Sequence, residues 1–133
     1  MATPATTDFI ISQGDSLPIM RIVVPRNTND ELLDLTDCDV VFLGRQVGDR
    51  TQPAPIIRPI DSYAIEDDEL AVYVHFDEAD TDIVISSKSG YFAEMQGELE
   101  ITTPTDVFTV PNSPTAPYIK WWIRDDIGAA TVV

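Results

Sequence analysis

Few residues in this 133-residue chain are of the types that carry out chemistry, and their spacing matches no catalytic motif. His75 is the single histidine and Cys38 the single cysteine, so the sequence holds neither a histidine cluster for a metal nor a pair for an internal disulfide. It also lacks a Gly-x-Ser-x-Gly elbow, a glycine-rich phosphate loop and a Cys-x-x-Cys pair. We therefore expect a protein that is not an enzyme and needs no cofactor, with His75 facing solvent on a strand.

The densest group of possible metal ligands is a run of carboxylates: Asp77, Glu78, Asp80 and Asp82. Carboxylate oxygens are the ligands that Ca²⁺ prefers, which makes Asp80 and Asp82 the calcium candidates of this chain. The run lacks the glycine and the distal glutamate of an EF-hand loop. The pattern therefore favours a solvated acidic loop, in which Asp80 could begin a short helical turn, and it predicts no dedicated metal site.

Aromatic and basic residues alternate with apolar ones near the end of the sequence. Successive side chains of a strand point to opposite faces, so this stretch predicts a strand with two different faces. The core face would carry Ile119, Trp121 and Ile123. The outer face would carry Tyr118, Lys120, Trp122 and Arg124.

An exposed tryptophan among tyrosine and cations has three interpretations. It is typical of an anchor for another protein, and it also occurs in sugar-stacking platforms. Alternatively, the proline-rich loop from Pro111 to Pro117 folds over Trp122 and covers it. We weigh protein contact and loop cover equally, and both above sugar stacking.

The element that organises the rest of the chain is the stretch from Gly90 to Ile101. Apolar residues occupy one parity: Tyr91, Ala93, Met95, Leu99 and Ile101. Polar and acidic residues occupy the other: Glu94, Gln96, Glu98 and Glu100. This period of two predicts a long strand in the middle of an antiparallel sheet, with one buried face and one wet, acidic face. The stretch from Leu70 to Phe76 shows the same alternation.

Roughly seven to eight short strands, separated by turn signals and without an amphipathic helix, predict an all-β fold, an antiparallel Ig-like β-sandwich. Pro59 predicts an edge strand, and Pro18 predicts either an edge strand or a bend, because proline lacks the N–H that a central strand needs. We expect this domain to span residues 9–127, between a flexible N-terminal arm (1–8) and an apolar C-terminal tail (128–133). The expected core residues are Phe42, Leu70, Val72, Val74, Tyr91, Met95, Leu99, Ile119 and Trp121.

Composition narrows the possible partners. The formal net charge is −15 and the isoelectric point is near 4.1, while 44% of the residues are hydrophobic, as in folded proteins. Such a surface repels phosphate backbones and anionic lipid, so we expect neither nucleic acid nor a membrane as partner. The sequence shows no signal peptide, and we expect folding in a cytosol. The negative charge either keeps the protein soluble or helps it to bind a basic partner.

Several short motifs follow one another in a familiar order. Gln13-Gly14-Asp15 opens the domain, and the stretches from Asp34 to Phe42, from Gly90 to Met95 and from Val107 to Pro111 follow it. This order resembles the immunoglobulin-like N-terminal module of phage baseplate upper proteins and related small tail or neck proteins. The family favours Gly-Ala where this chain has Asp37-Cys38, and its tyrosine lies one residue later than Tyr91.

The resemblance implies a structural component of a tailed-phage virion, in the tail, neck or baseplate, assembled in the host cytoplasm. Its partners would be other virion proteins and copies of itself. A capsid decoration or head-fibre protein is one alternative, and a carbohydrate-binding module using Trp122 and Tyr118 is another. The expected interface residues are Tyr118, Lys120, Trp122, Arg124, Val132 and Val133.

Overall fold

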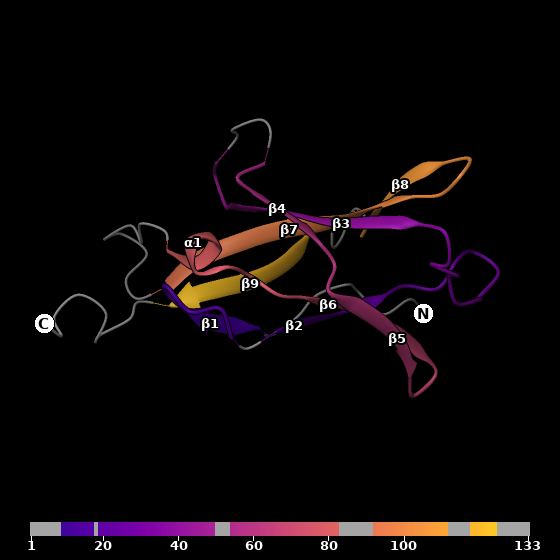
Figure 1. Ribbon diagram of the computed structural model, residues 1–133, viewed down its shortest axis with the longest axis horizontal. Coiled ribbons are helices and arrows are strands. Elements are labelled where there is room, and N and C mark those ends of the chain that lie inside the picture. Colours follow the sequence, from indigo (N-terminus) through magenta and orange to yellow (C-terminus); the bar gives the residue numbers. More distant parts are fainter. Residues whose placement is uncertain (1–8, 18, 50–53, 83–91, 112–117, 125–133) are drawn as a thin grey trace, which may run out of the picture.

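The computed structural model describes residues 9–17, 19–49, 54–82, 92–111 and 118–124 (Figure 1). The described residues form nine strands and one helical turn. In chain order these are β1 (Ile10–Ser12), β2 (Met20–Val24), β3 (Asp39–Gln46), β4 (Ile56–Pro59), β5 (Ser62–Glu66), β6 (Glu69–Val74), α1 (Glu78–Thr81), β7 (Phe92–Thr102), β8 (Val107–Val110) and β9 (Ile119–Arg124).

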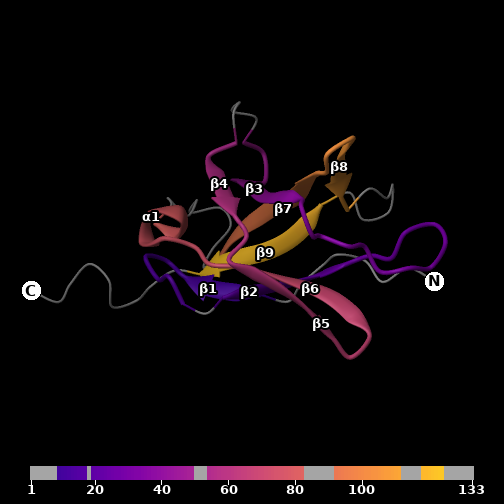
Figure 2. The ribbon, with the colours of Figure 1, turned by 45° about the vertical axis from the view of Figure 1, so that its right-hand side comes forward.

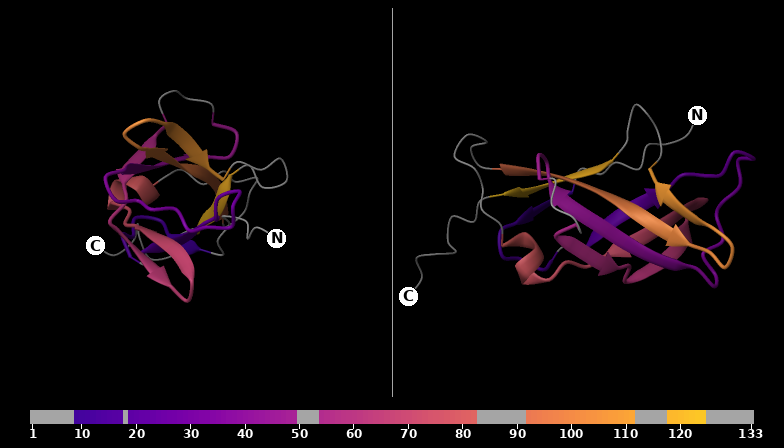
Figure 3. Two further views of the ribbon diagram at one scale, coloured as in Figure 1. Left: turned by 90° about the vertical axis from the view of Figure 1, so that its right-hand side faces the viewer. Right: turned by 90° about the horizontal axis from the view of Figure 1, so that it is seen from above.

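The strands form two sheets that pack face to face as a sandwich (Figure 3). Sheet A has the order β1-β9-β7-β3-β4, with β8 also paired to β7, and sheet B has the order β2-β6-β5. Along the described strands the chain passes to sheet B at β2 and returns at β3, then passes to sheet B again at β5 and returns at β7. The order β9-β7-β3-β4 opposite β2-β6-β5 is that of an immunoglobulin-like sandwich, which confirms the all-β prediction.

Two details differ from the prediction. Sheet A is mixed, because β1 runs parallel to β9, with Ile11 opposite Ile123. There are nine described strands, because residues Ser62–Glu66 form a strand, β5, that the sequence analysis did not expect. The last two expected strands, β8 and β9, are both present and pair with β7 in succession. Val110 lies opposite Leu99 and Ile119 lies opposite Gly97, so β8 and β9 continue one another along β7.

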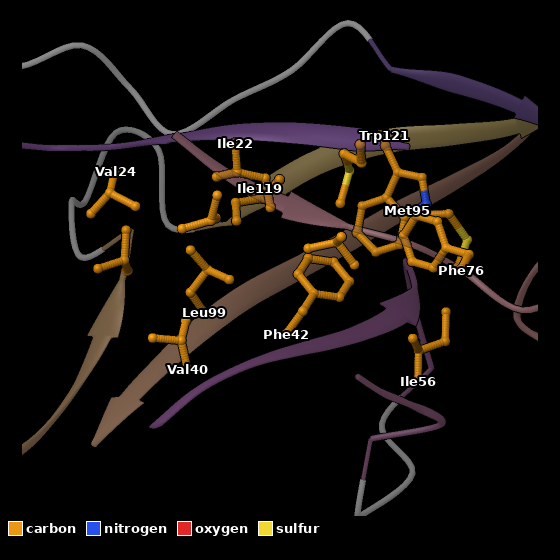
Figure 4. Packing of buried hydrophobic residues seen from close by; sticks show 14 of the residues in the cluster. Ile22, Val24, Val40, Phe42, Ile56, Phe76, Met95, Leu99, Ile119 and Trp121 are labelled. Carbon is orange, nitrogen blue, oxygen red and sulfur yellow. The ribbon is translucent and has the colours of Figure 1, made fainter. Parts of the chain in front are cut away.

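The core consists of the alternate residues that the two sheets turn toward each other (Figure 4). The buried members of the expected core are Phe42, Leu70, Val72, Val74, Met95, Leu99, Ile119 and Trp121. Tyr91 and its neighbour Gly90 lie outside the described residues. Three rings meet at the centre: Trp121 stacks on Phe76 at 5.8 Å between centroids, and Phe42 meets both edge-on.

The edge positions follow the prolines. β2 and β4 are edge strands, as Pro18 and Pro59 predicted, although residue 18 itself is outside the described part. The sequence left the parity of β2 open between two sets of apolar residues. Met20, Ile22 and Val24 point into the core, because they lie opposite Val74, Val72 and Leu70 of β6. A further strand, β5, forms the other edge of sheet B.

The helical turn α1 begins earlier than expected. Asp77 precedes it and Glu78 is its first residue, whereas the sequence suggested a start at Asp80. Asp80 instead lies inside the turn, where its carboxylate accepts the backbone N–H of Asp77 at 2.8 Å. Thr81 is buried and its hydroxyl donates to the carbonyl of Asp15 at 2.7 Å, so the turn is tied to the loop after β1.

Candidate interaction surface

The outer face of sheet A brings together the aromatic and basic residues that the sequence singled out. β9 lies between β1 and β7, and its outward residues are Lys120, Trp122 and Arg124. Tyr118 comes just before β9 and lies on the same face. The guanidinium of Arg45, a β3 residue opposite Gln96 of β7, lies 5.7 Å from the centroid of the Tyr118 ring. The predicted faces of this strand are therefore confirmed.

Trp122 is less exposed than the sequence suggested. It lies in one row across the sheet, with Ile10 of β1 on one side and Glu94 of β7 on the other. The side chains of Trp122 and Tyr118 are both partly buried. The backbone N–H of Trp122 donates to the carbonyl of Phe9 at 3.1 Å, a hydrogen bond that helps to set the register between β1 and β9.

This row and the neighbouring row contain apolar residues that the sequence analysis did not single out. Ile10 is 47% exposed, Phe92 is 43% exposed and Val47 is 45% exposed. Phe92 lies opposite Arg124, and Val47 donates its N–H to the carbonyl of Glu94 at 2.9 Å. We call Ile10, Val47, Phe92 and Trp122 the outer-face cluster. Phe92 has the parity of the acidic face of β7, so the alternation in the sequence already placed it there.

The charges around the outer-face cluster are mixed in sign. Lys120 and Arg124 are exposed, and within the described part of the chain neither forms an ion pair. Glu98 and Glu100 lie farther along β7 on the same face. An apolar centre with unpaired cations beside it can bury area against another protein and also contact a carboxylate there.

A polar cluster on the outer face of sheet B was not foreseen. Tyr73 donates its hydroxyl to both carboxylate oxygens of Glu66, at 2.6 and 2.7 Å, and Arg21 donates Nε to the same carboxylate at 3.1 Å. The hydrogen bond from Tyr73, with that from Arg21, lowers the pKa of Glu66. The same carboxylate raises the pKa of Tyr73. Arg21, Glu66 and Tyr73 lie on three different strands, β2, β5 and β6. Only the pairing of these strands brings the three side chains together.

The calcium candidates are differently placed. Asp80 is 9% exposed, and its two carboxylate oxygens accept hydrogen bonds from Arg58. Nε of Arg58 donates at 2.7 Å and a terminal nitrogen donates at 3.3 Å. Asp77 also pairs with Arg58, whereas Asp82 is exposed. The carboxylate of Asp80 thus serves an internal ion pair that holds α1 against β4. Among the described residues, no three histidine, cysteine, aspartate or glutamate side chains converge to hold a metal ion.

The other candidates fall in several places. His75 is exposed, as predicted, but it follows β6 and does not lie on a strand. Cys38 is free and partly buried, with Sγ 3.6 Å from the carbonyl of Asp34. Val132 and Val133, the arm (1–8), the tail (128–133) and residues 112–117 of the loop proposed to cover Trp122 lie outside the described residues. No helix in the described part is both long and apolar enough to cross a membrane.

Comparison with known proteins adds no relative. No protein-family model, no curated protein and no solved structure matches this chain.

Proposed function

We propose that this protein is a structural component of a tailed-phage virion that acts through protein–protein contacts. The observation that supports an assembly role is the outer-face cluster, in which Trp122 and three further apolar side chains share one row or its neighbour on the outside of sheet A. The motif order from Gln13 to Pro111 supports the virion, in the tail, neck or baseplate.

The charge balance indicates what kind of contact the protein makes. Copies that each carry a net charge of −15 repel one another, so contacts between them need buried apolar area to outweigh that repulsion. The outer-face cluster supplies such area, with Lys120 and Arg124 beside it for acidic groups of a neighbour. The proposed partners are other virion proteins and copies of this chain, met in the host cytoplasm, without nucleic acid or membrane.

The partial burial of Trp122 also bears on the alternatives. A sugar-stacking platform offers an open ring face, whereas Trp122 is flanked by Ile10 and Glu94 in its row. Such packing favours a protein contact over a carbohydrate module. A capsid decoration or head-fibre protein would use the same surface in the same way.

The test is incorporation into particles. A phage that lacks its own copy is complemented with a variant that combines Trp122→Ala with deletion of residues 128–133, and purified particles are examined for the protein. We expect the variant to fold, by circular dichroism, and to be missing from the particles. The matched control is Glu98→Ala, on the same face but outside the cluster, which should be incorporated normally.

Normal incorporation of the combined variant would rule out attachment through this surface and the tail. Binding of the isolated protein to a glycan array, lost on Trp122→Ala, would replace the proposal with the carbohydrate-binding alternative.

A further inference from the structure

Within the described part of the sandwich, β5 has a free edge with little protection. β5 is the last strand of sheet B and, among the described strands, pairs only with β6. Its five residues, Ser62–Glu66, include no proline and no lysine, the residues that usually block an edge. By contrast, β4 contains Pro59 and β1 has only three residues. Figure 2 shows the β5–β6 hairpin projecting from the rest of the sandwich.

The register identifies the backbone groups at this edge. Glu66 lies opposite Glu69, and the two residues between them, Asp67 and Asp68, have φ of 49° and 63°, as in a type I′ hairpin turn. In such a hairpin the pair that flanks the turn is hydrogen-bonded, and bonded pairs alternate along the ladder. The N–H and C=O groups of Tyr63 and Ile65 therefore point away from β6, toward the open edge.

The side chains at this edge are apolar and uncovered. Tyr63 and Ile65 lie opposite Val72 and Leu70 on the inner face of sheet B, yet they are 45% and 65% exposed because sheet A does not extend over them. Beside Tyr63 is an open hollow of about 440 Å³, lined by the apolar residues Val40 and Ile60 together with Cys38, Asp39, Asp61 and Ser62. A strand laid along β5 would direct alternate side chains onto this apolar surface.

The unpaired charges at the two ends of β5 are acidic. Asp61 precedes the strand and Asp67 follows it, and within the described part of the chain neither forms an ion pair. Asp68 pairs with Arg26 at 2.9 Å. A second copy of this chain would bring the same acidic ends and a net charge of −15 to the contact. Charge complementarity therefore favours a strand with basic flanks.

We propose that β5 accepts an extended segment of a basic partner protein, which adds a fourth strand to sheet B. The segment hydrogen-bonds to Tyr63 and Ile65, places apolar side chains over them and in the hollow, and sets lysine or arginine near Asp61 and Asp67. This inference goes beyond the proposed function, because it concerns the other sheet and a different partner chemistry from that of the outer-face cluster.

The experiment uses a synthetic probe, a peptide of alternating valine and threonine flanked by pairs of lysines, and a twin flanked by glutamates. Binding to the full chain is measured by calorimetry at about 0.15 M salt. We expect binding of the lysine peptide only. Amide hydrogen exchange should slow at Tyr63 and Ile65 when it binds, because their N–H groups become hydrogen-bonded.

Two kinds of variant locate the site. Ile65→Pro removes an outward N–H without touching the β5–β6 bonds, and we expect it to weaken peptide binding about tenfold, as for a lost hydrogen bond. Ile65→Lys, which blocks the edge without a backbone change, serves if the proline variant does not fold. The pair Asp61→Asn with Asp67→Asn should also weaken binding, and asparagine tolerates the positive φ of residue 67.

The controls separate this site from general attraction to an acidic protein. Glu98→Gln with Glu100→Gln removes the same charge from the other sheet and should leave binding unchanged, as should Trp122→Ala. Equal binding by every variant, no binding of the lysine peptide, or no protection of Tyr63 and Ile65 would overturn the proposal. So would dimerisation of the protein alone that Ile65→Pro abolishes, because the occupant would then be a second copy.

Discussion

Two glycines on neighbouring strands make room for the aromatic centre of the core. A methyl group built on Gly97 would lie 2.6 Å from the Phe42 ring and 2.7 Å from the backbone oxygen of Leu43. One built on Gly44 would lie 2.8 Å from the Trp121 ring. Neither ring can move far, because Phe42 and Trp121 are fully buried and contact each other. Glycine is required here for space, and neither position needs it for a turn.

We expect Gly97→Ala to destabilise the fold by about 1–3 kcal/mol, the usual cost of overpacking a core. The measurement is the free energy of unfolding from urea titration. Glu98→Ala, the next residue on the solvent side, should change this free energy by no more than about 0.5 kcal/mol. Equal stability of Gly97→Ala and the parent protein would show that the rings have space to move.

The Tyr73–Glu66 hydrogen bond makes stability depend on pH at both ends of the scale. The pKa of Glu66 is lowered from 4.5, so its contribution is fully present above pH 4.5 and is lost as the pH falls through the folded-state value. The pKa of Tyr73 is raised from 10.0, so its contribution is present below pH 10.0 and is lost as the pH rises through the folded-state value.

Glu66→Gln should remove this dependence, because it takes away the group that titrates at low pH and the carboxylate that raises the pKa of Tyr73. We expect the pKa of Tyr73, followed by NMR titration, to fall toward 10.0 in this variant. The loss of stability below pH 4.5 should also become shallower. Glu98→Gln is the matched control, since Glu98 lies on the other sheet. An unchanged pKa of Tyr73 in Glu66→Gln would contradict the assigned cause.

At the scale of elements, what the sequence predicts depends on whether the signal is local. The alternation from Gly90 to Ile101 predicts β7, and that from Leu70 to Phe76 predicts β6, because parity is set within a few neighbouring residues. The parallel pairing of β1 with β9 has no local signal, since it joins strands at opposite ends of the domain. Likewise, the alternation of residues in the sequence predicts that Trp122 points outward. That Ile10 lies beside it depends on the register between β1 and β9, which the sequence does not reveal.

The helical turn α1 has a non-local partner of the same kind. Its attachment depends on Arg58 of β4, which the sequence presents only as an edge-strand cation. We expect Asp80→Ala to lower the free energy of unfolding by about 1.5–3 kcal/mol, the range for hydrogen bonds to charged groups. The exposed Asp82→Ala should stay within about 0.5 kcal/mol, measured in the same urea titrations. Matching values for the two variants would mean that the Arg58 ion pair does not hold the turn.

For the whole molecule, the excess of acidic over basic residues opposes folding through self-repulsion. The chain has 23 aspartates and glutamates against 8 lysines and arginines. Raising the salt from about 0.01 M to about 0.15 M shortens the screening length from about 30 to about 8 Å. We therefore expect the melting temperature, measured by calorimetry, to rise over this range.

A variant with Glu94, Glu98 and Glu100 all changed to glutamine should show a smaller rise, because part of the repulsion is already removed. A melting temperature that falls with salt in the parent protein would mean that its ion pairs, such as Arg21 with Glu66, outweigh the repulsion.

The parallel pair of β1 and β9 also sets the order in which a ribosome can complete this sandwich. All three strands of sheet B have been made once Val74 is added, so its hairpin can form early. Ile11 of β1, however, must wait for Ile123, about 110 residues later, which takes on the order of 5 to 20 s of translation. During that interval the inner face of sheet B has no complete partner. The nascent chain therefore presents apolar surface to chaperones until its last strand emerges.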